Sequence, residues 1–161
     1  MITTARTGVT IFATPTDREV VITRVVAAPR ELVFDVHTRP EHLRRWLGPD
    51  GWSMPVCEVD LRPGGAYRYV WRKPSGTEIT ITGVVREVTR PERFVMTEVW
   101  GPEWPETVNT TVFTESAGRT TITLTITYAS REARDAALET GMKDGSEQSY
   151  GRLDKLLQEL V

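Results

Sequence analysis

The segment 141–160 carries a helical hydrophobic pattern that constrains the whole fold. At 3.6 residues per turn, one stripe of this segment consists of Met142, Ser146, Ser149, Leu153, Leu156 and Leu160. Charged and amide side chains occupy the opposite face, so the pattern predicts an amphipathic helix of about five turns. Leucines fill the second half of the stripe, whereas Gly145 and the two serines leave its first half thin. Packed against a sheet, such a helix closes a core at one end and leaves space at the other.

The chain before this helix alternates strand-like segments with turns. A segment dense in β-branched residues at 19–27 predicts the first strand, and six more follow between residues 54 and 128. Pro29 and Pro40 are placed to begin two short helices after the first strand. Consecutive strands joined by short turns form one antiparallel sheet. We therefore expect an α+β fold in which a curved antiparallel sheet of about seven strands surrounds the long C-terminal helix.

Length and composition are those of a single globular domain. Of the 161 residues, we expect 1–17 to form a loosely ordered arm with one short strand at 8–13, and 18–161 to form the domain. The net charge of −2 argues against a nucleic-acid partner. No apolar run approaches the ~20 residues that span a bilayer. A single cysteine, Cys57, and the lack of a signal-peptide pattern predict a cytoplasmic protein without disulfides.

Residues that bind metals or start covalent chemistry are few and scattered. His37 and His42 are the two histidines, and neither they nor Cys57 belong to a cluster with metal-ligand spacing. The glycine pair 64–65 lies between two predicted strands, which is typical of a hairpin turn rather than of a phosphate loop. The sequence therefore predicts no metal site, no cofactor and no catalytic residue.

Aromatic residues give the strongest indication of a site. Tyr67, Tyr69 and Trp71 alternate along one strand and share a face, which we expect to look toward the thin half of the helix, with Trp46 closing the mouth. The predicted ligand-binding pocket consists of Trp46, Tyr69, Trp71, Ile81, Met96, Thr110, Leu124, Met142, Ser146 and Ser149. If Met96 points inward, Glu98 does too, and burial would raise the pKa of its carboxyl.

Three motifs, in this order, resemble the bacterial homologues of the activator of Hsp90 ATPase. They are RWLGPDGW at 45–52, CEVDLRPGGAY at 57–67 and GMKDG at 141–145, and the resemblance covers about residues 18–160. It implies the helix-grip fold of the START-like, or Bet v 1-like, superfamily, with a cavity between the sheet and the last helix. Relatives often carry an aromatic residue just after the second glycine of the last helix, where this chain has Ser146.

We predict from these features that the protein binds a small hydrophobic or aromatic molecule, such as a lipid, polyketide or phenolic compound. The resemblance implies two alternatives, a cyclase or hydrolase acting on a polyketide-like substrate and a co-chaperone-type interaction module linked to stress response. The eukaryotic namesake domain works beside a second domain that is not found in this sequence, so we do not expect an Hsp90-type chaperone as partner. The sequence leaves open whether the protein forms a homodimer.

Overall fold

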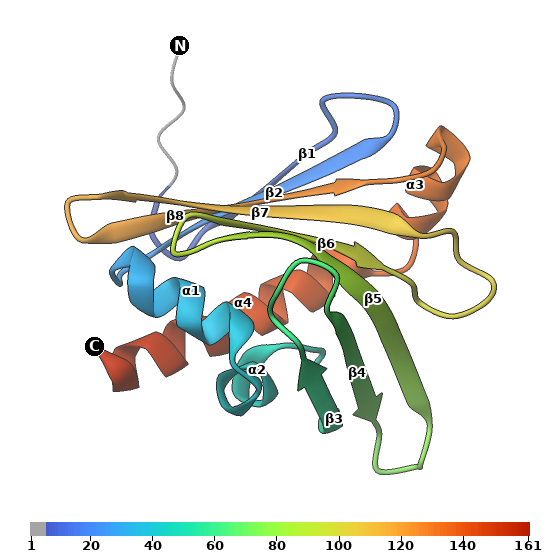
Figure 1. The fold of residues 1–161 in the computed structure, drawn as a ribbon, viewed down its shortest axis with the longest axis horizontal. Coiled ribbons are helices and arrows are strands. Elements are labelled where there is room, and N and C mark those ends of the chain that lie inside the picture. Colours follow the sequence, from blue (N-terminus) through green and yellow to red (C-terminus); the bar gives the residue numbers. More distant parts are fainter. Residues whose placement is uncertain (1–5) are drawn as a thin grey trace.

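A computed structural model describes residues 6–161, which form one antiparallel sheet and four helices (Figure 1). The strands are β1 (Thr10–Ala13), β2 (Glu19–Val26), β3 (Ser53–Val59), β4 (Ala66–Arg72), β5 (Glu78–Thr89), β6 (Arg93–Glu98), β7 (Thr107–Ser116) and β8 (Arg119–Thr127). The helices are α1 (Arg30–Thr38), α2 (Pro40–Trp46), α3 (Arg131–Leu138) and α4 (Met142–Leu160). This arrangement confirms the predicted α+β helix-grip fold.

The sheet follows the chain as a meander from β3 to β8, and β2 then pairs with β8 to complete the order β1-β2-β8-β7-β6-β5-β4-β3. The short strand expected at 8–13 is β1, which pairs with β2 from Thr10 opposite Arg24 to Ala13 opposite Val21. The described strands therefore number eight rather than about seven. Part of the expected arm, Thr10–Ala13, therefore belongs to the sheet, where it pairs with the outer edge of β2.

Gly83 permits a close approach of three strands near the middle of β5. A Cβ atom at this position would lie 2.0 Å from the Thr97 carbonyl oxygen and 2.5 Å from the Tyr67 ring. In the absence of a side chain there, the Tyr67 hydroxyl donates a hydrogen bond to that same carbonyl of Thr97. A β-bulge between Val85 and Glu87 follows directly, and bulges increase the local twist of a sheet. The sheet is thus bent where β4 and β6 both adjoin β5.

Helix α4 passes beneath the sheet, with α1 and α2 beside it (Figure 1). Its buried side chains are Ser149, Tyr150, Leu153, Leu156 and Leu157. Leu160 was expected on the buried stripe but is 39% exposed. The periodicity correctly gives the side of the helix, but it does not show that the layer covering α4 ends before the last turn.

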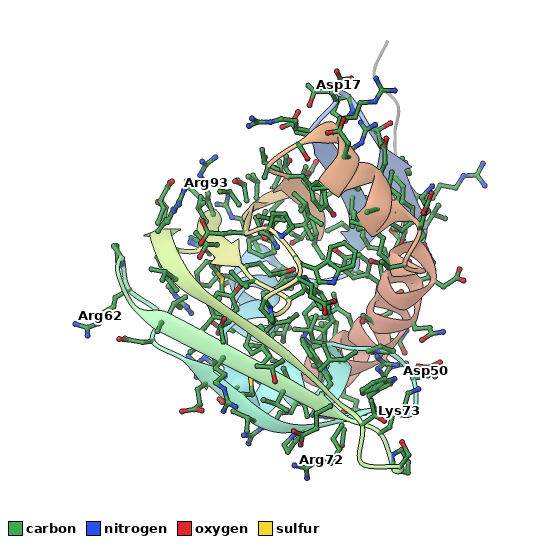
Figure 2. The ribbon with its side chains drawn as sticks, turned by 90° about the vertical axis from the view of Figure 1, so that its right-hand side faces the viewer. Asp17, Asp50, Arg62, Arg72, Lys73 and Arg93 are labelled. Carbon is green, nitrogen blue, oxygen red and sulfur yellow. The ribbon has the colours of Figure 1, made fainter. Side chains whose placement is uncertain are left out.

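Charged side chains lie mainly at the periphery, as Figure 2 shows for Asp17, Arg62 and Arg72. Arg24 is an exception, since it is 3% exposed and donates to Thr10 at 2.7 Å and to Asp154 at 2.5 Å. These bonds connect α4 to the first two strands. None of the helices in the described part of the chain has both the length and the hydrophobicity to cross a membrane.

Candidate cavity between the sheet and the last helix

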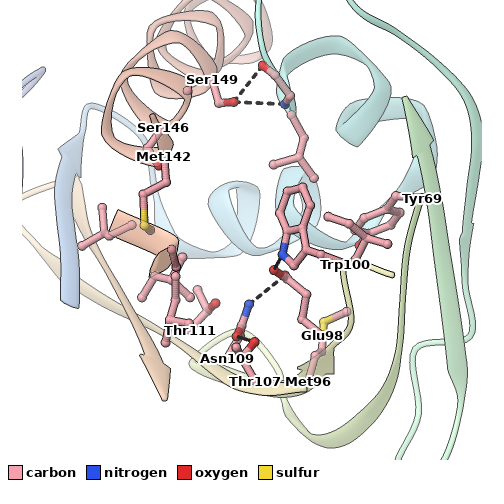
Figure 3. Close-up of a pocket in the computed structure, with 18 of the residues that line it drawn as sticks. Tyr69, Met96, Glu98, Trp100, Thr107, Asn109, Thr111, Met142, Ser146 and Ser149 are labelled. Atoms are coloured by element: carbon pink, nitrogen blue, oxygen red, sulfur yellow. Dashed lines mark hydrogen bonds between the residues drawn. The ribbon is translucent and has the colours of Figure 1, made fainter. Parts of the chain in front are cut away.

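A cavity of about 640 Å³ lies between the inner face of the sheet and the first half of α4 (Figure 3). The thin part of the helix contributes Met142, Gly145 and Ser146 to its wall. Strands β4 to β8 contribute the largest share of the remainder, mainly as aliphatic and aromatic side chains. The space is therefore located where the uneven stripe of α4 predicts it, opposite the end at which Leu153 and Leu156 fill the core.

Nine of the ten predicted pocket residues line this cavity. They are Trp46, Tyr69, Trp71, Ile81, Met96, Leu124, Met142, Ser146 and Ser149. Thr110 is not among the lining residues, whereas its neighbours Asn109 and Thr111 are. Successive residues of a strand point to opposite faces, and β7 has threonine at both 110 and 111, so its pattern does not show which one faces inward. That the lining residues contact a ligand stays a prediction.

Trp46 does not close the mouth of the cavity. It is 4% exposed, its Nε1 donates to the Val36 carbonyl at 2.8 Å, and its ring stacks on Tyr150 at 6.2 Å between centroids. It therefore belongs to the inner wall. The lining aromatics with exposed surface are Trp100 and Trp104, at 45% and 37%, in the connection between β6 and β7. Neither tryptophan is among the ten predicted pocket residues.

Ser149 clamps α4 to the loop that follows α2 (Figure 3). Its Oγ accepts a hydrogen bond from the Gly48 amide at 3.0 Å and donates to the Gly48 carbonyl at 2.9 Å. Gly48 has φ of +117°, and a Cβ there would lie 2.3 Å from Trp71 Nε1. That indole nitrogen donates to the Leu47 carbonyl at 3.0 Å. Because Ser149 is occupied within the protein, Ser146 is the serine of α4 that remains available to a ligand.

Glu98 points into the cavity, as expected from the orientation of Met96 (Figure 3). Trp100 Nε1 donates to one carboxylate oxygen, and Asn109 Nδ2 donates to the other at 2.8 Å. The Thr107 hydroxyl donates in turn to Asn109 Oδ1 at 2.8 Å. Burial raises the pKa of the Glu98 carboxyl above its ordinary value of 4.5, an effect that the two hydrogen bonds reduce.

His37 also lines the cavity, although it is not among the predicted pocket residues. Its Nδ1 lies 2.8 Å from the Val33 carbonyl, so Nδ1 carries the proton and Nε2 carries the lone pair. The ring contacts Trp46 and Phe113 at centroid distances of 4.8 and 4.9 Å. Burial lowers the pKa of His37 to about 4, so the ring is neutral at pH 7. Within residues 6–161, no three His, Cys, Asp or Glu side chains are grouped as a metal site requires.

The family model for Activator of Hsp90 ATPase homolog 1-like proteins matches residues 27–158. The chain belongs to this family. The match includes every residue of the cavity wall except Ile22 on β2, and it confirms the resemblance seen in the three sequence motifs. Comparison with curated proteins found no match.

Solved structures of similar proteins extend the comparison to the whole fold. A Rhodobacter sphaeroides protein is 30% identical, over 94% of this chain and 99% of its own, with a TM-score of 0.88. A Nitrosomonas europaea protein is 27% identical, over 91% and 97%, with a TM-score of 0.81. A Mycobacterium smegmatis protein is 28% identical, over 88% and 91%, with a TM-score of 0.79. The helix-grip architecture is therefore shared along nearly the full length of these relatives.

Proposed function

We propose that this protein binds a small hydrophobic or aromatic molecule in the cavity between the sheet and α4, in the cytoplasm and without a cofactor. The observation that carries the proposal is the cavity, whose volume of about 640 Å³ falls in the range of ~300–1,000 Å³ that is usual for small-molecule sites. Its wall is mostly apolar and aromatic, with a few polar groups such as Glu98, Asn109 and Ser146. Apolar walls with few, well-placed polar groups are typical of ligand pockets.

The arrangement of α4 supports the same proposal. A helix that only closed a core would carry large apolar residues opposite the sheet, since unfilled space removes contacts from the walls that surround it. Instead α4 presents Gly145 and Ser146 to the cavity. The clamp between Ser149 and Gly48 then holds the neighbouring loop in place without filling the space. These features keep the cavity open and favour its occupation by a ligand.

The test is binding of the neutral fluorescent probe N-phenyl-1-naphthylamine to purified protein. We expect saturable binding by the wild type and by Ser146→Ala, which leaves the cavity open. Ser146→Trp should place an indole ring in the cavity and weaken probe binding, while the melting temperature stays equal or rises because more apolar surface is buried. Full probe binding by Ser146→Trp, or its severe unfolding, would show that residue 146 does not face open space. Native mass spectrometry of the wild type would then look for a co-purified molecule.

Acid–base chemistry at Glu98 is the second candidate function. The specific observation in its favour is a carboxyl group that faces an apolar cavity and has a raised pKa, as a general acid requires near neutral pH. The corresponding class is a cyclase or hydrolase of polyketide-like substrates. Release of phenol from an aryl acyl ester by the wild type, but not by Glu98→Gln, would favour an enzyme over a binding protein.

A further inference from the structure

Glu98 is a carboxyl group without a cationic partner in the wall of the cavity. Within the described residues it is the one carboxylate of the lining, and neither lysine nor arginine contributes to that lining. Its two oxygens accept hydrogen bonds from the neutral groups of Trp100 and Asn109. None of the ion pairs found in residues 6–161 includes it. The ionised carboxylate thus has hydrogen-bond donors but no counter-ion.

Aromatic rings surround the same part of the cavity. Trp100, which donates to Glu98, stacks on Trp71 with centroids 6.3 Å apart and an interplanar angle of 10°. On β4, the rings of Tyr69 and Trp71 meet edge to face at 5.8 Å, and both line the cavity. The faces of aromatic rings carry negative electrostatic potential and attract cations. The carboxylate and the ring faces therefore both favour a positively charged ligand.

We propose that the ligand carries a protonated amine or a similar organic cation, which pairs with Glu98 while its hydrophobic body fills the cavity toward Leu124 and Ser146. This inference rests on the proposed function and specifies the class of ligand. A cation supplies the counter-ion that the protein does not, and its desolvation is offset by the carboxylate and by the aromatic faces. Fatty acids and phosphorylated ligands are disfavoured, because the wall offers no cation and would place a second negative charge near Glu98.

The protonation of Glu98 makes this binding dependent on pH. The other titratable groups that line the cavity are His37 on α1, Tyr67 and Tyr69 on β4, Tyr128 after β8, and Tyr150 on α4. Burial raises the pKa of all four tyrosines, to about 12 for Tyr128 and Tyr150, and lowers that of His37 to about 4. Of the titratable groups in the lining, Glu98 is the carboxyl group, and burial raises its pKa above the ordinary value of 4.5. A cation favours its ionised form, so cation binding should strengthen as pH rises through the raised pKa.

The experiment displaces bound N-phenyl-1-naphthylamine with three molecules of equal chain length, decylamine, decanol and decanoate, each below its solubility limit or critical micelle concentration. At pH 7.5 we expect decylamine to displace the probe at about tenfold lower concentration than decanol, and decanoate to be the weakest. Glu98→Gln should reduce the difference between amine and alcohol to less than about threefold. That variant keeps its hydrogen bonds, since the Asn109 amide can turn over and the Thr107 hydroxyl can accept instead of donate.

The possible outcomes separate the two proposals. Equal displacement by the three molecules, or a preference for decanol or decanoate, would overturn the cation while leaving a hydrophobic site in place. Failure of the wild type to bind the probe at all would contradict the proposed function itself. If Glu98→Gln does not fold, the wild type decides the question, because its preference for amine over alcohol should grow as pH rises through the raised pKa of Glu98. A preference that does not change with pH would contradict the role of Glu98.

Discussion

The clamp between Ser149 and Gly48 predicts a measurable difference between two serines of the same helix. Ser149→Ala removes the donor and the acceptor that satisfy the Gly48 carbonyl and amide, which are partly buried. Each such bond contributes about 0.5–1.5 kcal/mol net, so the loss is about 2 kcal/mol. Alanine is the better helix former and offsets this loss by up to about 0.5 kcal/mol. The matched control is Ser146→Ala, one turn earlier, where the same gain in helix propensity occurs without loss of the clamp.

The assay is urea unfolding followed by tryptophan fluorescence, with the slope of the transition checked for constancy. We expect Ser149→Ala to be about 2 kcal/mol less stable than Ser146→Ala, which corresponds to a melting temperature lower by about 4–8 °C for a chain of this length. Ser146→Ala should match or slightly exceed the wild type. Equal unfolding midpoints for the two variants would refute the clamp and would show that water satisfies Gly48 equally well.

Two further predictions concern the core and pH. Leu153 is fully buried, whereas Leu160 is 39% exposed. Leu153→Ala should therefore lower the free energy of unfolding by about 2–5 kcal/mol, and Leu160→Ala should lower it by much less. Similar losses for the two variants would contradict the packing of α4. The pKa of His37 is lowered to about 4 in the folded state, so the unfolded chain binds the proton more tightly and stability falls as pH drops from about 6.5 to 4. The control variant is His37→Asn, which keeps a hydrogen-bond donor toward the Val33 carbonyl. Relative to this variant, the free energy of unfolding of the wild type should fall by about 2 kcal/mol between pH 7 and 5. Parallel plots of stability against pH for the two proteins would exclude this contribution of His37.

Several features of the fold could be predicted because they depend on periodicity within one segment. The period of 3.6 places Ser149, Leu153 and Leu156 on the inner side of α4, and all three are buried. The period of two places Met96 and Glu98 on the same face of β6, and both line the cavity. In each case the geometry of a single helix or strand decides the orientation of the side chain. The relative orientation of side chains within one helix or strand can therefore be predicted from their spacing in the sequence.

Other features could not be predicted because they depend on where elements meet. Thr110 and Thr111 have the same side chain, and only the register between β7 and its neighbours determines which one faces inward. The sequence also suggests no difference between Trp46 and Trp100, yet the first is buried against Tyr150 and the second is exposed at the cavity. The position of a tryptophan relative to a cavity depends on the surrounding elements rather than on its own segment.

The sequence by itself determined the class of fold, the uneven helix and the half of that helix beside which the cavity lies. Only the tertiary structure decided the chemistry of that cavity. Ser149 meets Gly48 across 101 positions of the chain, and Asn109 meets Glu98 across a strand pair. Hydrogen bonds of this kind have no local signal, since each partner is an ordinary polar group until folding brings the other within about 3 Å. For the same physical reason, the sequence does not show which hydrogen-bond donors and aromatic rings surround the Glu98 carboxyl group, and these neighbours decide which ligands it favours.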